Sequence, residues 1–136
     1  MDAPVLEFLF TITAATNLTG TIANGPAGTR IVVDASTGTF EGPRLRGTVS
    51  GPTGDWVTMR ADGSMHLDVR LLMKTEDGAD ILMEYRGIGL AGATHITTAP
   101  MFQTGHADYA WLNSVVAVAR GSSGGGSVSY DVYHVA

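Results

Sequence analysis

The sequence contains no cysteine and a single lysine, and these two shortages narrow the range of functions before any motif is considered. Without cysteine, the chain has no disulfide, no thiolate nucleophile and no cysteine-based metal site. Lys74 is the only lysine among eight basic residues, and the excess of arginine suits fixed ion pairs and anion recognition. The net charge of −5 argues against a nucleic-acid partner, which would need a basic stripe.

Familiar site motifs are also absent. There is no P-loop, no dinucleotide fingerprint, no Gly-x-Ser-x-Gly turn and no His-Glu-x-x-His pair. The four histidines are widely spaced, and each is more simply an isolated polar residue than a metal ligand, because zinc needs three or four converging ligands. We therefore expect no metal site and no cofactor.

The N-terminal region lacks the features of a targeting segment. No basic region precedes its first apolar stretch, Val5 to Phe10, and Glu7 interrupts that stretch. It is too short and too polar for a signal peptide or a membrane span. This predicts a cytoplasmic protein with no membrane partner.

The chain does have the pattern of an all-β protein. Its 136 residues fit one domain, residues 1–136, and its eighteen glycines fit many turns. Eight or nine expected strands follow one another closely along the chain, with turn residues between them. This pattern predicts an antiparallel barrel or a sandwich, and a barrel of about eight strands can hold one small ligand. Tyr109 to Ala119 is ambiguous between helix and strand because it is rich in alanine and valine, and Gly121 to Ser127 is expected to be a hairpin loop. The expected strands are Val5–Thr13, Arg30–Asp34, Thr39–Val49, Asp55–Arg60, Met65–Thr75, Asp80–Gly89, Ile96–Phe102, Tyr109–Arg120 and Ser127–Val135.

Two Asp-Gly pairs, at positions 62–63 and 77–78, predict how three of these strands align. Asp-Gly supplies the positive φ angles of a two-residue type I′ hairpin turn. Side chains alternate between the two faces of a strand, so this alignment predicts one polar and one apolar face. The polar face collects Asp55, His66, Asp68, Arg70 and Tyr85. The apolar face, with Glu84 and Arg86 as exceptions, collects Trp56, Met65, Leu67, Val69, Leu71, Met73, Leu82 and Ile88. One residue more or less in either loop would reverse the assignment.

Two interpretations of the polar face remain open. In the first, it faces solvent, Asp55 and Arg70 form an ordinary surface pair, and the apolar face is the core. In the second, the sheet closes into a barrel, the polar face lines a cavity, and the apolar face is covered by other elements or by another subunit.

Five segments resemble the bacterial DUF3237 family, also called UPF0311. They are Gly38 to Gly47, Ala61 to Gly63 with Leu67 to Arg70, Tyr85 to Gly87, Pro100 to Gly105, and Tyr109 to Asn113. The resemblance spans nearly the whole chain. It implies a small antiparallel barrel, similar to the allene oxide cyclase and dirigent barrels, whose interior binds small, largely apolar molecules. It also implies a homo-oligomer, either a dimer or a trimer, and it favours the second interpretation of the polar face.

A cavity of this kind suggests proton transfer next to a carbonyl group. Desolvation brings an aspartate into the range of a general acid or base, arginine stabilises a developing oxyanion, and tyrosine donates a hydrogen bond. We therefore expect a small-molecule enzyme without a cofactor, a cyclase, isomerase or lyase. Asp68 is the expected acid/base, Arg70 the anion stabiliser and Tyr85 the hydrogen-bond donor. The alternative is that Asp55 and Arg70 simply neutralise each other.

Further candidates would bind the substrate without reacting. Asp55 and His66 belong to the predicted polar face, Tyr109, Trp111 and Asn113 share one face of the next predicted strand, and Arg46, with Arg44, could bind an anionic group. Asn113 could equally satisfy a backbone group where the barrel closes, and the two arginines could be solvent-exposed.

The competing function is a protein that binds a hydrophobic small molecule without transforming it, and a third is a structural subunit.

Overall fold

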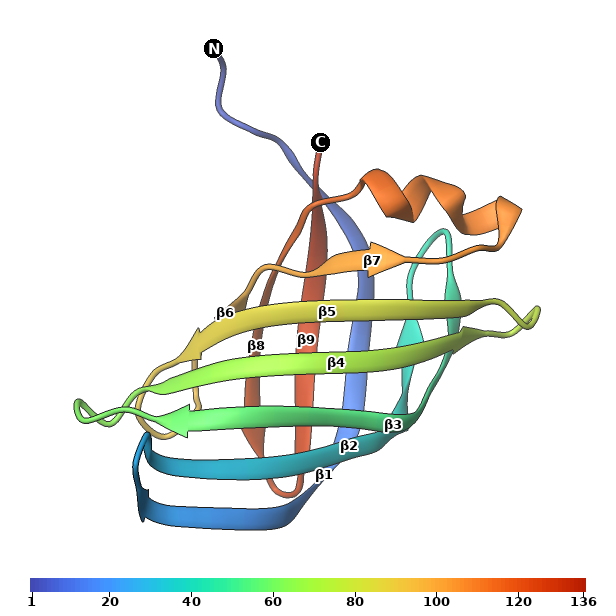
Figure 1. Ribbon diagram of the computed structural model, residues 1–136. Coiled ribbons are helices and arrows are strands. Elements are labelled where there is room, and N and C mark those ends of the chain that lie inside the picture. Colours follow the sequence, from blue (N-terminus) through green and yellow to red (C-terminus); the bar gives the residue numbers. More distant parts are fainter.

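Apolar and polar residues alternate along most of the chain, and the computed structural model, which describes residues 1–136, is accordingly almost entirely β (Figure 1). A single short 3₁₀ helix, η1 (Ala107–Ser114), interrupts the strands. The strands are β1 (Leu6–Gly25), β2 (Gly28–Glu41), β3 (Arg46–Met59), β4 (Met65–Thr75), β5 (Asp80–Gly89), β6 (Ile96–Thr98), β7 (Met101–Gln103), β8 (Ala117–Gly124) and β9 (Ser127–Val135).

The strands close into a barrel through antiparallel pairs only. The ring runs β1-β2-β3-β4-β5-β6-β8-β9 and returns to β1, because β4 pairs with β5 and β6 pairs with both β5 and β8. β7 pairs with β5 as a ninth strand. This confirms the predicted all-β antiparallel barrel. Closure satisfies the backbone hydrogen bonds that the edges of an open sheet would expose.

Several strands have other bounds than predicted. β1 continues beyond Thr13 to Gly25, the expected strand Thr39–Val49 is divided by the turn between Glu41 and Arg46, and the expected strand Ile96–Phe102 is divided into β6 and β7.

Two further segments have a different kind of structure from the one predicted. Residues 107–114 form η1 in place of the first half of the expected strand from Tyr109, and the side chain of His106 caps this helix by accepting a hydrogen bond from the Asp108 N–H. The expected loop from Gly121 to Ser127 is mostly strand, because β8 continues to Gly124 and only Gly125 and Gly126, both at positive φ, make the turn.

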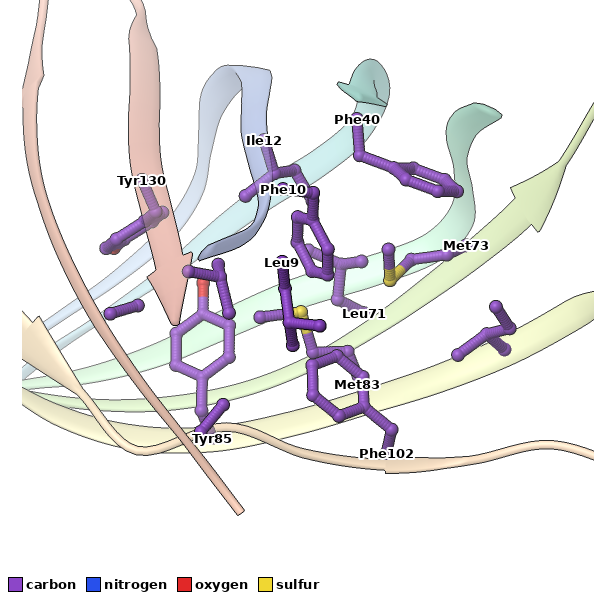
Figure 2. Packing of buried hydrophobic residues seen from close by; sticks show 14 of the residues in the cluster. Leu9, Phe10, Ile12, Phe40, Leu71, Met73, Met83, Tyr85, Phe102 and Tyr130 are labelled. Atoms are coloured by element: carbon purple, nitrogen blue, oxygen red, sulfur yellow. The ribbon is translucent and has the colours of Figure 1, made fainter. Parts of the chain in front are cut away.

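One end of the barrel is filled by aromatic side chains. We call it the closed end; it carries the β4–β5 hairpin, η1 and both chain termini (Figure 1). Phe10 packs edge-to-face against Phe40 and Phe102 at centroid distances of 5.8 and 6.0 Å. Figure 2 shows these three rings in the core. Leu112 of η1 is fully buried and belongs to the same hydrophobic core. Burial of these large side chains supplies much of the hydrophobic stabilisation of the fold.

The opposite end, which we call the open end, carries the β3–β4 and β8–β9 hairpins. Here β1 continues past its last pair with β9, at Ala15, and pairs only with β2. Three irregularities in the β1–β2 register bend the two strands around this end. The side chains that point inward here are mostly alanine, valine, leucine and isoleucine, and they leave a cavity between them. The chain contains no helix long and apolar enough to cross a membrane.

Candidate functional site

The alignment of β3, β4 and β5 depends on two hairpin turns that both contain an Asp-Gly pair. In the first, the Arg60 N–H donates to the Ser64 carbonyl at 2.8 Å, which leaves three residues in the loop, with Gly63 at φ 84°. In the second, the Thr75 N–H donates to the Ala79 carbonyl at 2.9 Å, and Gly78 has φ 93°. Each glycine occupies the left-handed position that ends a three-residue hairpin loop.

The prediction of two-residue turns is therefore wrong, and the register shifts by one residue. Asp55 lies opposite Val69, where Arg70 was predicted, and Val69 lies opposite Tyr85. The alternation within β4 is as predicted, with Leu67, Val69, Leu71 and Met73 buried. The shift moves the neighbouring strands relative to β4, so Asp55 and Tyr85 join its apolar face. Trp56, Leu82 and Ile88, predicted on that face, lie on the outer face of the barrel instead, and Trp56 is exposed there.

A cavity of about 290 Å³ lies inside the open end of the barrel. Sixteen of its twenty lining residues are hydrophobic, so a bound molecule would lose most of its contact with water. The four others are Thr16, Gly54, Asp55 and Ser123, and the hydroxyl groups of Tyr85 and Tyr130 add two polar groups to the wall. The full lining is Ile12, Ala14, Thr16, Leu18, Ile31, Val33, Ala35, Gly54, Asp55, Val57, Met65, Leu67, Val69, Leu71, Tyr85, Ala93, Ile96, Ser123, Val128 and Tyr130.

Asp55 is the only charged residue of this lining. Burial disfavours its charged form and raises the pKa of the carboxyl group to about 7. Two smaller effects oppose each other: the backbone N–H of Asp68 donates to Asp55 Oδ1 at 3.1 Å and lowers the pKa, while the negative charge of Asp68 raises it. Near neutral pH the group is therefore present in both protonation states, as a general acid or base requires.

Two tyrosines accompany Asp55 in the cavity wall. Tyr85 of β5 and Tyr130 of β9 are 8% and 5% exposed, and their rings meet edge-to-face at 5.8 Å (Figure 2). Burial is the main reason that the pKa of each hydroxyl is raised, and the nearby charge of Asp55 raises both further. Both hydroxyls therefore stay protonated at any working pH and can donate hydrogen bonds.

The other residues of the predicted polar face lie on the outside of the barrel. Asp68 and Arg70 are exposed and face Arg86 and Glu84 of β5, and His66 is half-buried on the same outer face. The prediction that these three share a face with Asp55 and Tyr85 is wrong, because of the three-residue turns. The structure does not bring Asp68 or Arg70 into the cavity.

The remaining substrate-binding candidates lie at the closed end, away from the cavity. The Tyr109 hydroxyl donates to the Asp77 carboxylate at 2.9 Å, and the guanidinium of Arg44 stacks over Trp111 at 3.6 Å. Arg46 is exposed, and its Nη1 lies 4.0 Å from Oε1 of Glu41. The predicted strand face of Tyr109, Trp111 and Asn113 is wrong, because η1 replaces that strand.

Asn113 fulfils the alternative role considered for it. Its Oδ1 accepts from the Thr104 N–H at 2.8 Å and its Nδ2 donates to the Thr104 carbonyl at 3.0 Å. The side chain therefore satisfies the backbone between β7 and η1, as a structural amide does.

Tyr130 was missed by sequence reasoning. It belongs to the last strand, where no Asp-Gly turn indicates a register, and alternation alone does not show which face of an isolated strand points inward. Tyr130 pairs with Ile12 of β1, whose apolar side chains point into the barrel, and this pairing places the Tyr130 side chain inside. Nowhere in the structure do three or more His, Asp or Glu side chains come together as a metal site would require.

The chain is similar to several known proteins. It is 32% identical to the hydroalkoxylation enzyme phnH of Penicillium herquei over 114 residues, which cover 84% of this chain and 72% of that protein. It is 25% identical to a UPF0311 protein of Rhodopseudomonas palustris, with 97% and 98% of the two chains covered.

Solved structures share the fold. A β-barrel-like protein from Acinetobacter baumannii superposes with a TM-score of 0.87 at 28% identity, covering 100% of this chain and 98% of that one. An enzyme from Penicillium herquei superposes with a TM-score of 0.78 at 26% identity, covering 100% and 97%. The family model described as "Protein of unknown function (DUF3237)" matches residues 4–135. The chain therefore belongs to the DUF3237 family, at least one relative of which is an enzyme.

Proposed function

We propose that the protein is a cofactor-independent enzyme that closes an oxygen-containing ring by adding a substrate hydroxyl group across a carbon–carbon double bond conjugated to a carbonyl. Asp55 is the acid/base, and Tyr85 and Tyr130 donate hydrogen bonds to the carbonyl oxygen. The observation that carries the proposal is one carboxylate with a pKa of about 7 in an otherwise largely apolar cavity, beside two protonated tyrosines.

The reaction balances within one substrate molecule. Charged Asp55 takes the proton of the hydroxyl group, and the oxygen forms a bond to the β-carbon of the unsaturated carbonyl. The electron pair of the double bond moves to the carbonyl oxygen as an enolate, which the tyrosine hydroxyls stabilise. Asp55 then returns the proton to the α-carbon. The product is an isomer of the substrate, and no oxidant, reductant or second reactant is consumed.

The relative from Penicillium herquei supports this choice of reaction. Hydroalkoxylation, which its name states, is the addition of an oxygen–hydrogen bond across a carbon–carbon double bond. Among the cyclase, isomerase and lyase reactions that an acid/base cavity allows, ring closure of this type uses both a base and an oxyanion stabiliser.

A direct test uses 2′-hydroxychalcone, whose phenol closes onto its own enone to give a flavanone. We expect the protein to accelerate ring closure over buffer and to favour one enantiomer, as followed by absorbance and chiral chromatography. Asp55→Asn should lower the rate by at least about 100-fold, the scale of general acid–base catalysis. Asp68→Asn is the matched control, because Asp68 lies on the outer face of the neighbouring strand and its backbone N–H remains.

The two aspartate variants also distinguish Asp55 from Asp68, the acid/base expected from the sequence. If Asp68→Asn loses activity and Asp55→Asn keeps it, the acid/base is Asp68, and the cavity is not the site. If the chalcone binds with micromolar affinity while racemic closure proceeds at the buffer rate, the enzyme proposal fails.

The second candidate is a protein that binds a hydrophobic small molecule without transforming it. The apolar character of the lining favours it, since sixteen of twenty lining residues would hold an apolar ligand without any chemistry. A carrier requires no titrating group, so Asp55→Asn would leave its ligand affinity within a few-fold of the wild-type value.

A further inference from the structure

The barrel interior contains no positive charge. None of the seven arginines, the one lysine or the four histidines lies among the residues that line the cavity. The basic residues of β4 and β5, which include Arg70, Lys74 and Arg86, all point outward and are exposed. An anionic ligand would therefore enter an apolar cavity with no cation to pair with.

Asp55 adds a specific repulsion to this general cost. A ligand carboxylate beside charged Asp55 would place two like charges a few ångström apart, which corresponds to roughly 100-fold in affinity at the effective dielectric of partly buried sites. No side chain of the lining offers a compensating ion pair. Desolvation and charge therefore both oppose the binding of an anionic ligand.

The polar groups of the wall suit an uncharged ligand with a hydroxyl group. Charged Asp55 accepts a hydrogen bond from such a hydroxyl, and Tyr85 and Tyr130 can donate to an oxygen of the same ligand. A protonated amine would also be attracted to Asp55. It would, however, bring three N–H donors into a wall in which Asp55 is the only anionic acceptor, and it would lose its hydration.

We propose that the cavity selects uncharged, hydroxyl-bearing, mostly apolar molecules and rejects carboxylates, with Asp55 as the residue that determines this specificity. The inference rests on the same site as the proposed function and names the class of its substrate. It concerns binding, so it can be tested without turnover.

The test compares three probes on one scaffold: 2-naphthol, 2-naphthoate and 2-naphthylmethylamine. Binding to the wild-type protein is measured by calorimetry at about pH 8, where Asp55 is mostly charged, naphthol is uncharged, and the other two carry opposite charges. We expect naphthol to bind at least about 100-fold more tightly than naphthoate and more tightly than the amine. Equal or tighter binding of naphthoate overturns the inference, as does tightest binding of the amine or failure of naphthol to bind up to its solubility limit.

The Asp55→Asn variant tests whether Asp55 causes the preference for naphthol over naphthoate. The variant keeps the size of the side chain and removes its charge, so naphthoate should gain about tenfold or more in affinity relative to the wild type, while Asp68→Asn should leave the ratio unchanged. An unchanged ratio in Asp55→Asn means that Asp55 does not determine specificity.

A pH series on the wild-type protein gives the same information without a variant. Lowering the pH to about 5.5 protonates most of Asp55 and should strengthen naphthoate binding. The ionisable groups that face Asp55 are Tyr85 of β5, Tyr130 of β9 and, across the wall, Asp68 of β4. Both tyrosines stay neutral in this range, so Asp55 is the expected source of the change. Naphthoate affinity that does not rise overturns the assignment.

The outcomes are separable from those of the chalcone experiment. Selective naphthol binding without ring closure supports the ligand class and removes the enzyme proposal. Ring closure with equal naphthoate and naphthol affinity supports the enzyme and removes the specificity inference.

Discussion

Burial and hydrogen bonding have opposite effects on the pKa of Asp55, and the effect of burial is the larger. Its carboxylate receives one hydrogen bond, from the Asp68 N–H at 3.1 Å, but burial costs more than this bond returns. The pKa is therefore about 7 when the protein is folded, against 3.8 for an unperturbed aspartate. The charged form is disfavoured in the folded protein, so ionisation of Asp55 lowers the free energy of unfolding.

We expect Asp55→Asn to stabilise the protein at about pH 8 by an amount on the order of 2 to 4 kcal/mol, measured by urea denaturation. Because the folded-state pKa is raised, the folded protein binds more protons than the unfolded chain between about pH 4 and pH 7. The stability of the wild type therefore falls as the pH rises through this window and is constant above it. At about pH 4 the variant and the wild type should differ little.

Asp68→Asn, a substitution on the exposed outer face, is the control and should stay within about 0.5 kcal/mol of the wild type. A variant at position 55 that is less stable than the wild type at pH 8 would show that burial does not dominate the environment of this carboxylate.

The same pKa predicts a pH dependence of ring closure. Charged Asp55 is the base, so kcat/KM should rise with pH and level off above a midpoint near pH 7. The measurement is the rate with 2′-hydroxychalcone between about pH 5 and 9, corrected for the buffer reaction. A midpoint near pH 4 would indicate a solvent-exposed base and argue against Asp55.

Tyr85→Phe should lower kcat by about 10- to 100-fold, because it removes one hydrogen bond to the enolate oxygen while Tyr130 remains. The ring and its packing against Tyr130 are kept, so unfolding should change little. Tyr109→Phe is the matched control: it removes the hydrogen bond to Asp77 at the closed end and should leave kcat unchanged. Equal losses in both variants would contradict the placement of the site.

At the scale of elements, the two hairpin turns decide which residues face the cavity. Within β4 the period of two is plain in the sequence, and its buried residues were predicted correctly. What alternation cannot give is the number of residues in a turn. Asp-Gly fits both the two-residue and the three-residue loop, because each has a position that favours glycine at positive φ.

Gly78 lies in the turn between β4 and β5, where its backbone conformation favours glycine. It holds φ 93°, so Gly78→Ala should cost about 1 kcal/mol of unfolding free energy even though nothing lies within 4 Å of the added methyl group. Gly105→Ala is the control, because it also has open space and no positive φ. Thermal or urea unfolding of both variants measures the difference, and equal stabilities would mean that the turn tolerates a side chain.

At the scale of the whole molecule, the barrel is filled at one end and hollow at the other. Phe10→Ala, in the closed-end cluster, should cost about 3 to 5 kcal/mol, because it removes a fully buried ring and leaves a new cavity. Ile31→Ala, in the cavity wall, should cost only about 1 kcal/mol, because Ile31 is half-buried beside a space that already exists. Urea denaturation compares the two, and similar losses would contradict a hollow open end.

Two expectations from the sequence stay predictions at this scale: self-association into a dimer or trimer, and a cytoplasmic location. Sedimentation equilibrium of the full chain measures the first and fractionation of the source cells the second. A monomer at micromolar concentration would contradict the expected homo-oligomer.

The sequence by itself determined the all-β architecture, the bounds of β4, β5 and β9, and the family, because alternation, turn residues and local motifs are properties of short segments. It also named Asp55 and Tyr85, which both line the cavity. Only the tertiary structure decided which side chains share the cavity. Asp68 and Arg70 went outside and Tyr130 came inside because a turn one residue longer than expected, and the pairing of β9 with β1, fix the faces of strands whose own sequences allow either side.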